Sequence, residues 1–411
     1  MSLHHVGRRP LVTLLVISTS ALVLGLAGCG GASDPEPVAG PPPATGGNVT
    51  FDAEAMIINT ADNIITPTYV ELDQRAAQLV SSAESLDDGG ATEAELDAAQ
   101  AAWRAARAPW EASEGFLFGP VDSLGIDPAI DSWPLDTPAL SAFLAATPNA
   151  TQQDVESASD DLRGFHAIEY VLFGDGVSSN DRQATSLTAP EIKYLVALSR
   201  AFKARTALLV AAWTTDFNGT GPFAATVKTP GAANASYKSQ SAVIEEFVNG
   251  LAGIAAEVGS AKIGEPLGTS IGAADTTKVE SQYSWNSLAD FHDNVQSILN
   301  VYTGKRGFNP SIDTVSAGQN GLYAFVAAHD AALATRTLDE ILDAQRKIAL
   351  IKGDGDTSSA AIGAGDKPFR QQIPDAGGRV LIQAAVDALT KLQATLEAGV
   401  QPLIGKTTFG G

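Results

Sequence analysis

Apolar residues recur every three or four positions along most of the chain, and runs of strict alternation are short. This spacing places apolar side chains on one face of a helix, whereas alternation would indicate strands. From Phe51 onward the sequence is also rich in Ala and Leu, which favour helices. We therefore predict an all-α protein with helices over these residue ranges: 52–86, 92–112, 138–147, 151–173, 189–215, 236–259, 280–302, 318–350 and 375–403.

Start and stop signals accompany several of the predicted helices. Thr92 precedes Glu95, and Thr188 precedes Glu191, at the spacing of a capping box, in which each side chain bonds the other residue's backbone N–H. Gly174 follows the apolar run over 151–173 and is expected to end that helix, because glycine adopts the backbone conformation that terminates helices.

A stretch rich in Gly, Pro, Asn and Thr interrupts the helical pattern between residues 214 and 234. Segments of this composition connect domains or halves of domains. The length on either side suits two small bundles better than one large core. We therefore expect an N-terminal helical-bundle half over 50–217 and a C-terminal helical-bundle half over 218–411.

The first 28 residues resemble an export signal. Two arginines precede an apolar run, and Leu-Ala-Gly-Cys at 26–29 has the form of a lipoprotein cleavage site. This predicts a lipoprotein signal peptide over 1–28 and a mature chain that a lipid on Cys29 anchors to a membrane. Gly30 follows, where aspartate would indicate inner-membrane retention. We therefore expect a bacterial cell-envelope protein, facing the periplasm or the surface, with the outer membrane favoured.

Composition limits the chemistry of the mature chain. Residues 29–49 are rich in Gly, Pro, Ala and Ser and are predicted to form a disordered tether. Cys29 is the only cysteine, which rules out an internal disulfide. The formal charge of −21 disfavours binding to nucleic acid and attracts cations. Any transition-metal site must then combine carboxylates with the histidines that remain after export: His166, His292 and His329.

The strongest candidate for chemistry is the hexapeptide Gly-Phe-His-Ala-Ile-Glu at 164–169. Residues three apart share a helix face, so His166 and Glu169 can direct a nitrogen and an oxygen to the same point. The pair could bind a metal, act as a coupled acid and base, or form a hydrogen-bonded pair in a helical core. The spacing alone leaves all three interpretations open.

A second polar segment, residues 103–122, runs from a helix end into a Gly- and Pro-rich loop. Arg107 could orient a carboxylate through paired hydrogen bonds. Ser113, Glu114 and Asp122 are placed to reach a shared site. A helix end held by aromatic side chains would explain the same residues without any site.

Two further segments carry polar residues of interest. Glu280 and Ser284 would share one face of the helix predicted over 280–302, which indicates either a pocket wall or a polar helix contact. The stretch 127–136 is an irregular loop with several aspartates, of the kind that lines clefts.

The common enzyme signatures are missing from the sequence. It contains no His-Glu-x-x-His, and the inverted zinc motif is incomplete because Tyr170 stands where its second histidine belongs. Nucleophile-elbow, phosphate-loop and dinucleotide patterns are absent as well. A zinc carboxypeptidase would need strands, which the pattern does not predict.

Together these segments resemble the imelysin family, whose hallmark Gly-x-His-x-x-Glu corresponds to Gly164, His166 and Glu169. The resemblance implies an all-α fold of two helical-bundle halves related by approximate internal symmetry, with a site between them. Members are envelope proteins, several of them tied to iron, and the family carries a metallopeptidase label. Three other segments share in the resemblance: 110–122, 262–268 and 280–284.

The resemblance implies one bound metal ion, iron or else zinc or manganese. Its expected ligands are His166, Glu169 and Glu114, with Asp122 as a further one. Residues expected to orient these ligands or to line the cleft are Arg107, Ser113, Glu280 and Ser284. The expected function is metal capture or uptake beside an envelope iron-uptake partner. The alternatives are a metallopeptidase and a metal-free module that binds a peptide or glycan.

Overall fold

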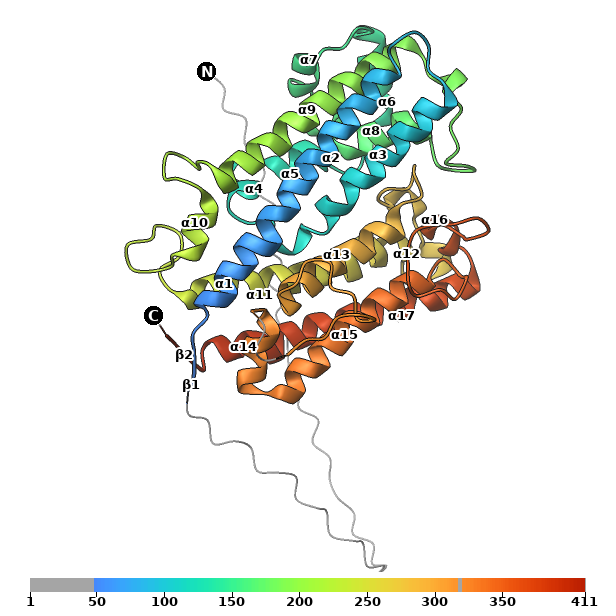
Figure 1. Cartoon of the computed structure of the whole chain (residues 1–411). Helices are drawn as coiled ribbons and strands as arrows, with labels where there is room; N and C mark the ends of the chain where they lie inside the picture. The colour runs from blue at the N-terminus through green and yellow to red at the C-terminus, as the bar shows by residue number, and fades with distance from the viewer. Residues whose placement is uncertain (1–47, 317–319, 411) are drawn as a thin grey trace, which may run out of the picture. The chain divides into compact units, whose positions relative to one another are not determined.

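The computed structural model describes residues 48–316 and 320–410, and most of them are helical (Figure 1), which confirms the all-α prediction. The earlier α-helices are α1 (Glu54–Thr60), α2 (Thr66–Ser85), α3 (Glu93–Glu111), α4 (Pro120–Ser123), α5 (Ile126–Ile130), α6 (Thr137–Ala146), α7 (Gln152–Glu156), α8 (Phe165–Phe173), α9 (Ala189–Thr214) and α10 (Phe223–Lys228). The later ones are α11 (Gln240–Ala256), α12 (Glu265–Leu267), α13 (Ser287–Thr303), α14 (Leu322–His329), α15 (Ala331–Leu350), α16 (Phe369–Gln372), α17 (Ala376–Thr395) and α18 (Gln401–Ile404).

Shorter elements join these helices. Three π-helical segments continue neighbouring α-helices: η1 (Ala61–Ile65), η5 (Glu257–Gly264) and η8 (Leu396–Val400). The 3₁₀ turns within residues 48–316 and 320–410 are η2 (Glu114–Phe116), η3 (Asp160–Leu162), η4 (Ala184–Ser186), η6 (Ile271–Ala273) and η7 (Thr276–Lys278). Two strands, β1 (Val49–Phe51) and β2 (Thr407–Phe409), pair in parallel. The strand pair therefore brings the beginning and the end of the described chain together.

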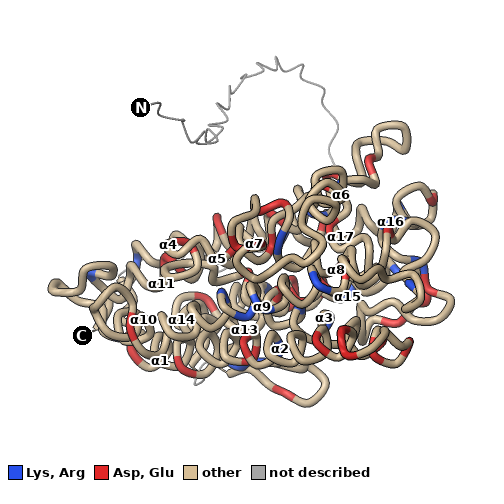
Figure 2. Tube along the Cα trace, turned by 90° about the horizontal axis from the view of Figure 1, so that it is seen from above, with Lys and Arg blue, Asp and Glu red and all other residues tan. Residues whose placement is uncertain are grey.

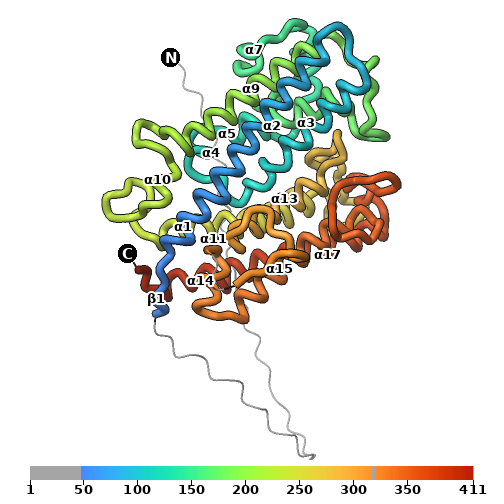
Figure 3. Tube along the Cα trace, viewed as in Figure 1, coloured from blue at the N-terminus to red at the C-terminus, as the bar shows by residue number. Residues whose placement is uncertain are grey.

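The long helices pack in two groups (Figure 3). In the first, α2 lies against α3 and α9. Helix α3 also contacts α8. In the second, α15 lies against α17 and α13, and α11 contacts both α13 and α17. Contacts between α3 and α13 join the groups. The division at residues 217 and 218 stays a prediction, because all the described residues belong to one compact unit.

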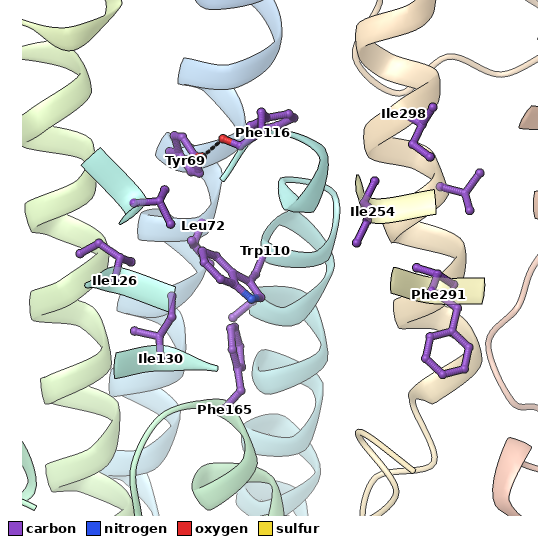
Figure 4. Close-up of a cluster of buried hydrophobic side chains, with 14 of the residues drawn as sticks. Tyr69, Leu72, Trp110, Phe116, Ile126, Ile130, Phe165, Ile254, Phe291 and Ile298 are labelled. Carbon is purple, nitrogen blue, oxygen red and sulfur yellow. Dashed lines mark hydrogen bonds between the residues drawn. The ribbon is translucent and has the colours of Figure 1, made fainter. Parts of the chain in front are cut away.

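Large apolar side chains fill the interior of both groups (Figure 4). Tyr69, Trp110 and Phe165 come from α2, α3 and α8 and are fully buried. The Tyr69 hydroxyl donates a hydrogen bond of 3.0 Å to the Phe116 carbonyl, so its polar end is satisfied inside the core. Phe291 on α13 belongs to the second group. The helical spacing of apolar residues thus produces the faces on which these helices pack.

Two predicted capping boxes are confirmed. The Thr92 side chain accepts from the Glu95 N–H while the Glu95 carboxylate accepts from the Thr92 N–H, and Thr188 and Glu191 repeat the arrangement. Gly174 ends α8 as predicted, but its φ of +78° and ψ of −152° differ from the left-handed helical conformation expected of a glycine at a helix end.

The single helix predicted over 151–173 is wrong. Helix α7 ends at Glu156, and α8 starts only after Gly164. Gly164 has a φ of +81° and a ψ of −161°, a conformation open almost only to glycine and incompatible with a continuing helix. A Cβ on Gly164 would lie 2.3 Å from the Ile130 carbonyl oxygen, so the close approach also requires glycine.

The helix predicted over 280–302 begins later than expected, at Ser287. Ser281 and Trp285 have φ values of +49° and +61°, which a helix does not allow. Tertiary hydrogen bonds hold this turn: the Trp285 indole donates to the Gly176 carbonyl over 2.8 Å, and Ser284 bonds Glu169. Because residues 280–286 are not helical, Glu280 and Ser284 do not share a helix face.

The helix predicted over 318–350 also divides, because Asp330 ends α14 and caps α15 with its side chain. Predictions for residues 1–47, including the signal peptide, Cys29 and most of the tether, lie outside the described residues. Among the described helices, none combines the length and the apolar character needed to cross a membrane.

Candidate metal site

Arg107 is the centre of a buried network of charges. Its side chain on α3 is fully buried, and its guanidinium pairs with four carboxylates. Nη2 lies 2.5 Å from Glu111 and 2.6 Å from Glu280, Nε lies 3.1 Å from Asp290, and Nη1 contacts Asp131. Burial lowers the pKa of Arg107, but the four carboxylates raise it further, so its net pKa is well above the usual range. Arg107 therefore stays charged and holds these carboxylates together.

His166 lies beside this network on α8 and is fully buried. Its Nδ1 is 3.0 Å from Glu169 Oε2. Its Nε2 is 3.2 Å from Asp131 Oδ1 and 3.7 Å from Glu280 Oε1. Nε2 is not aligned for a hydrogen bond to any described residue. The Trp133 ring packs edge-on against the imidazole, with 4.7 Å between the ring centroids.

Neighbouring carboxylates determine the charge of His166. Burial lowers the pKa of His166, and Asp131, Glu169 and Glu280 raise it by more, so the net pKa lies well above its usual range. Burial raises the pKa of Asp131, whereas Arg107 and His166 lower it further, and this carboxylate is ionised.

Glu169 uses both carboxylate oxygens. Oε1 accepts from the Ser284 backbone N–H over 2.8 Å and from the Ser284 hydroxyl over 2.7 Å, while Oε2 faces His166 Nδ1. Because Oε1 already accepts both hydrogen bonds from Ser284, we assign Oε2 as the acceptor of the Nδ1 proton. Glu169 thus fixes the orientation of the imidazole and leaves Nε2 directed toward Asp131 and Glu280, an arrangement common around histidines that bind metals.

Three residues have ligand atoms close enough for one metal ion. One atom each from Asp131, His166 and Glu280 lies within 4.8 Å of the others. One imidazole nitrogen and two carboxylate oxygens suit Fe, Zn or Mn. The carboxylates keep free lone pairs beside their bonds to Arg107. The buried Nε2 without a hydrogen bond is the atom that a metal would satisfy, so these residues fit a metal ion.

A second group of carboxylates adjoins the first and shares Asp131 with it. Glu111, Glu114 and Asp131 also offer atoms within 4.8 Å of one another. The Lys262 ammonium on η5 lies 3.7 Å from Glu111, 3.9 Å from Glu114 and 3.3 Å from Glu280. Burial raises the pKa of Glu111 and that of Glu114 well above the usual range.

The structure brings most of the predicted site residues together. Arg107, Glu280 and Ser284 contact the proposed ligands or Glu169, as described above. Ser113 is buried and donates to the Trp110 carbonyl over 2.6 Å, a bond local to the end of α3. Asp122 is exposed on α4 and belongs to neither metal-capable group.

Sequence reasoning missed four residues of this network: Glu111, Asp131, Lys262 and Asp290. Asp131 follows α5 in the stretch 127–136, whose aspartates gave a weak signal; this stretch was predicted to be an irregular loop, but it is helical up to Ile130. Acidic residues are spread along the whole described chain (Figure 2), so the acidic composition did not single out Glu111, Asp131 or Asp290. His292 and His329 lie outside both metal-capable groups among the described residues.

The chain belongs to the imelysin family, whose model matches residues 65–396. It is 30% identical over 404 residues to iron-regulated protein A of Synechococcus elongatus, covering 97% of this chain and 98% of the relative. A crystal structure from Parabacteroides distasonis, assigned as an iron-regulated protein A precursor, is 29% identical with a TM-score of 0.72, covering 89% of this chain and 97% of that one. An imelysin-like protein from Psychrobacter arcticum shares the fold at 16% identity and a TM-score of 0.64, covering 89% and 99%.

Proposed function

We propose that this protein binds one metal ion through His166 Nε2, Asp131 and Glu280, and that it serves in iron capture or uptake. The observation that carries the proposal is the buried Nε2 of His166, which faces two carboxylates and has no hydrogen bond among the described residues. Leaving a buried nitrogen without an aligned hydrogen bond costs free energy, and a metal ion bound to that nitrogen would remove the cost.

Iron is proposed because of the relatives. One relative that matches nearly the whole chain is named iron-regulated protein A, and a similar crystal structure carries a related name. The ligand types alone do not separate iron from zinc or manganese, since imidazole and carboxylate bind all three. The metal would be cargo, held by side chains that Arg107 and Glu169 orient.

We favour metal binding over hydrolysis for this site. A hydrolytic metal site needs a carboxylate free to take a proton from water. Asp131 and Glu280 are paired with Arg107, and Glu169 accepts hydrogen bonds from Ser284. These three carboxylates around His166 are thus engaged in holding other groups.

Metal titration of the purified protein tests the proposal. Fe²⁺ without oxygen, Zn²⁺ and Mn²⁺ are added while bound metal is measured by elemental analysis and calorimetry. Wild type is expected to bind one equivalent, and His166→Ala and Asp131→Asn to weaken binding at least ~10-fold, because each removes a ligand. His292→Ala makes the same change at a histidine outside the metal-capable groups and should bind as wild type does. Failure of folded wild type to bind any of these metals would refute the proposal.

We further propose that a lipid on Cys29 anchors the protein in the cell envelope, with the outer membrane favoured, beside an iron-uptake partner. The proposal is supported by the Leu-Ala-Gly-Cys sequence at 26–29. Labelling with a clickable palmitate analogue should mark the wild-type protein and leave Cys29→Ser unmarked. Equal labelling of the two would contradict anchoring through this cysteine.

A further inference from the structure

We infer that Arg104 is a positioning residue of the metal site, because it fixes the turn over 280–286, and with it the ligand Glu280, against α3 and α8. The inference rests on the proposed function, since it takes Glu280 to be a metal ligand. It goes beyond that function by giving a task to a side chain that binds no metal itself.

The Arg104 guanidinium holds the turn at two points. Nη2 donates to the Ser284 carbonyl over 3.0 Å, and Nη1 donates to Asn286 Oδ1 over 3.2 Å. A planar guanidinium directs its donors at fixed angles to one another. Two acceptors on one segment therefore set both the position and the direction of that segment.

The turn that Arg104 holds closes on itself and includes the ligand. The Asn286 backbone N–H donates to the Ser281 carbonyl over 3.1 Å. The Ser287 hydroxyl, at the start of α13, donates to the Glu280 carbonyl over 2.6 Å. Because these bonds tie both ends of the turn together, a shift of the turn carries Glu280 with it.

Helix α3 holds the ligand at its carboxylate and at its backbone. Arg107 Nη2 lies 2.6 Å from the Glu280 carboxylate. Arg104 precedes Arg107 by three residues on the same helix face and holds the turn. The Arg104 Cζ also lies over the Phe173 ring, 4.6 Å from its centroid, and Phe173 is the last residue of α8, the helix of His166. Arg104 thus links the helix of one ligand to the turn of another.

The charge of Arg104 opposes metal binding. Burial lowers the pKa of Arg104, and the carboxylates of Glu169 and Asp290 raise it by less, so the guanidinium lies close enough to interact with both. A positive charge at this place repels a cation. Loss of the charge alone would therefore strengthen metal binding, whereas loss of positioning would weaken it. The sign of the effect separates the two roles.

Removing Arg104 should leave a folded protein. Both hydrogen-bond acceptors of Arg104 are neutral groups, so their loss of this donor leaves no charge unpaired. The Ser284 carbonyl keeps a second donor, Asn180 Nδ2, at 2.8 Å. Arg104 and Asn286 are both partly exposed, so water can replace the lost bond to the amide.

Calorimetric titration of the full-length protein with Zn²⁺ tests the inference. Arg104→Met is expected to weaken binding ~10-fold, as loss of a group that orients a ligand does. Arg104→Lys keeps the charge without the planar fork and should weaken binding as well. Asn180→Ala removes the other donor to the Ser284 carbonyl and should cost less. Arg200→Met is the control, since this arginine is 52% exposed and pairs with Glu84 at 2.7 Å elsewhere.

A second measurement needs no metal. The Trp285 indole lies in the turn and donates to the Gly176 carbonyl, so ¹⁹F NMR of protein labelled with fluorotryptophan reports on the turn. Arg104→Met should shift the Trp285 signal. The signal of Trp213, which is fully buried on α9, should stay in place. Arg200→Met should shift neither signal.

The outcomes separate the two proposals. If wild type binds Zn²⁺ and Arg104→Met binds it as tightly or more tightly, the inference is wrong and the proposed function stands. If wild type binds no metal and Arg104→Met shifts the Trp285 signal, the proposed function fails while Arg104 still fixes the turn. An unchanged Trp285 signal would overturn the inference. If Arg104→Met does not fold, Arg104→Lys decides: wild-type affinity in that variant would show that the fork is not needed.

Discussion

The two ring nitrogens of His166 have different partners, and this difference decides what the residue can do. Nδ1 is held by Glu169, whose other oxygen is held in turn by Ser284. Nε2 faces Asp131 and Glu280 and has no hydrogen bond within the described part of the chain. A neutral imidazole binds a metal through the nitrogen that lacks the proton, so Glu169 selects Nε2 for binding.

Replacing Glu169 by Gln should therefore weaken metal binding without removing a ligand. The Gln carbonyl would accept from Ser284, and its amide would donate to Nδ1. The proton would then move to Nε2 and block the metal. We expect affinity to fall ~10–100-fold, as for other partners of metal-binding histidines.

Titration with Zn²⁺ measures the loss of affinity, and ¹⁵N NMR of the histidine ring reports which nitrogen is protonated. Ser284→Ala is the matched control, because Glu169 keeps its bond to the Ser284 backbone N–H. Its affinity should change less than that of Glu169→Gln. If Glu169→Gln binds Zn²⁺ as tightly as wild type does, Glu169 does not position His166. The same conclusion would follow if the proton stays on the same ring nitrogen.

At the residue scale, the sequence predicted part of this site. Spacing along one helix correctly brought His166 and Glu169 together, because the i and i+3 relation is local. The spacing does not predict which ring nitrogen of His166 faces Glu169. Asp131 and Lys262 reach the site through tertiary packing, which leaves no periodic signal along the chain.

Gly164 determines how α8 meets the loop that carries Asp131. Its φ of +81° and ψ of −161° suit glycine alone, and a Cβ would meet the Ile130 carbonyl at 2.3 Å. Gly174 at the other end of α8 has nearly the same conformation, with φ +78° and ψ −152°, and open space around it.

Comparing alanine substitutions at these two glycines separates the cost of backbone strain from the cost of the close contact between Gly164 and Ile130. Gly174→Ala should cost about 1–3 kcal/mol of unfolding free energy from strain alone. Gly164→Ala should cost more and should also weaken metal binding, since it separates His166 from Asp131. Urea unfolding and Zn²⁺ titration of both variants measure these effects. If both variants lose the same stability and keep their metal affinity, the contact of Gly164 with Ile130 does not determine the position of His166 relative to Asp131.

At the element scale, the sequence predicted where helices exist better than where they end. The capping boxes of Thr92 and Thr188 form as predicted, because each uses residues three apart. The turn over 280–286 was predicted as helix, since its residues have no local signal against one. Glu169 and Arg104 reshape it from another part of the chain: Arg104 donates to the Ser284 carbonyl over 3.0 Å.

For the whole molecule, the site joins distant parts of the chain. Asp131 and His166 come from the half predicted over 50–217, whereas Glu280 comes from the half over 218–411. Arg107 on α3 pairs with Asp290 on α13, and these two helices are in contact where the packed groups meet. Binding of one ion would therefore stabilise both parts together.

Hydrogen exchange with and without metal tests this coupling. A ligand at ~100 times its dissociation constant stabilises the folded state by about 2.7 kcal/mol, and only segments tied to the site slow their exchange. Saturating Zn²⁺ should slow exchange in α8, in α5 with the loop after it, and in residues 280–290. His166→Ala should show no slowing in any of them. Protection limited to α8 and α5 would mean that Glu280 takes no part in binding and that the ion does not connect the two parts of the chain.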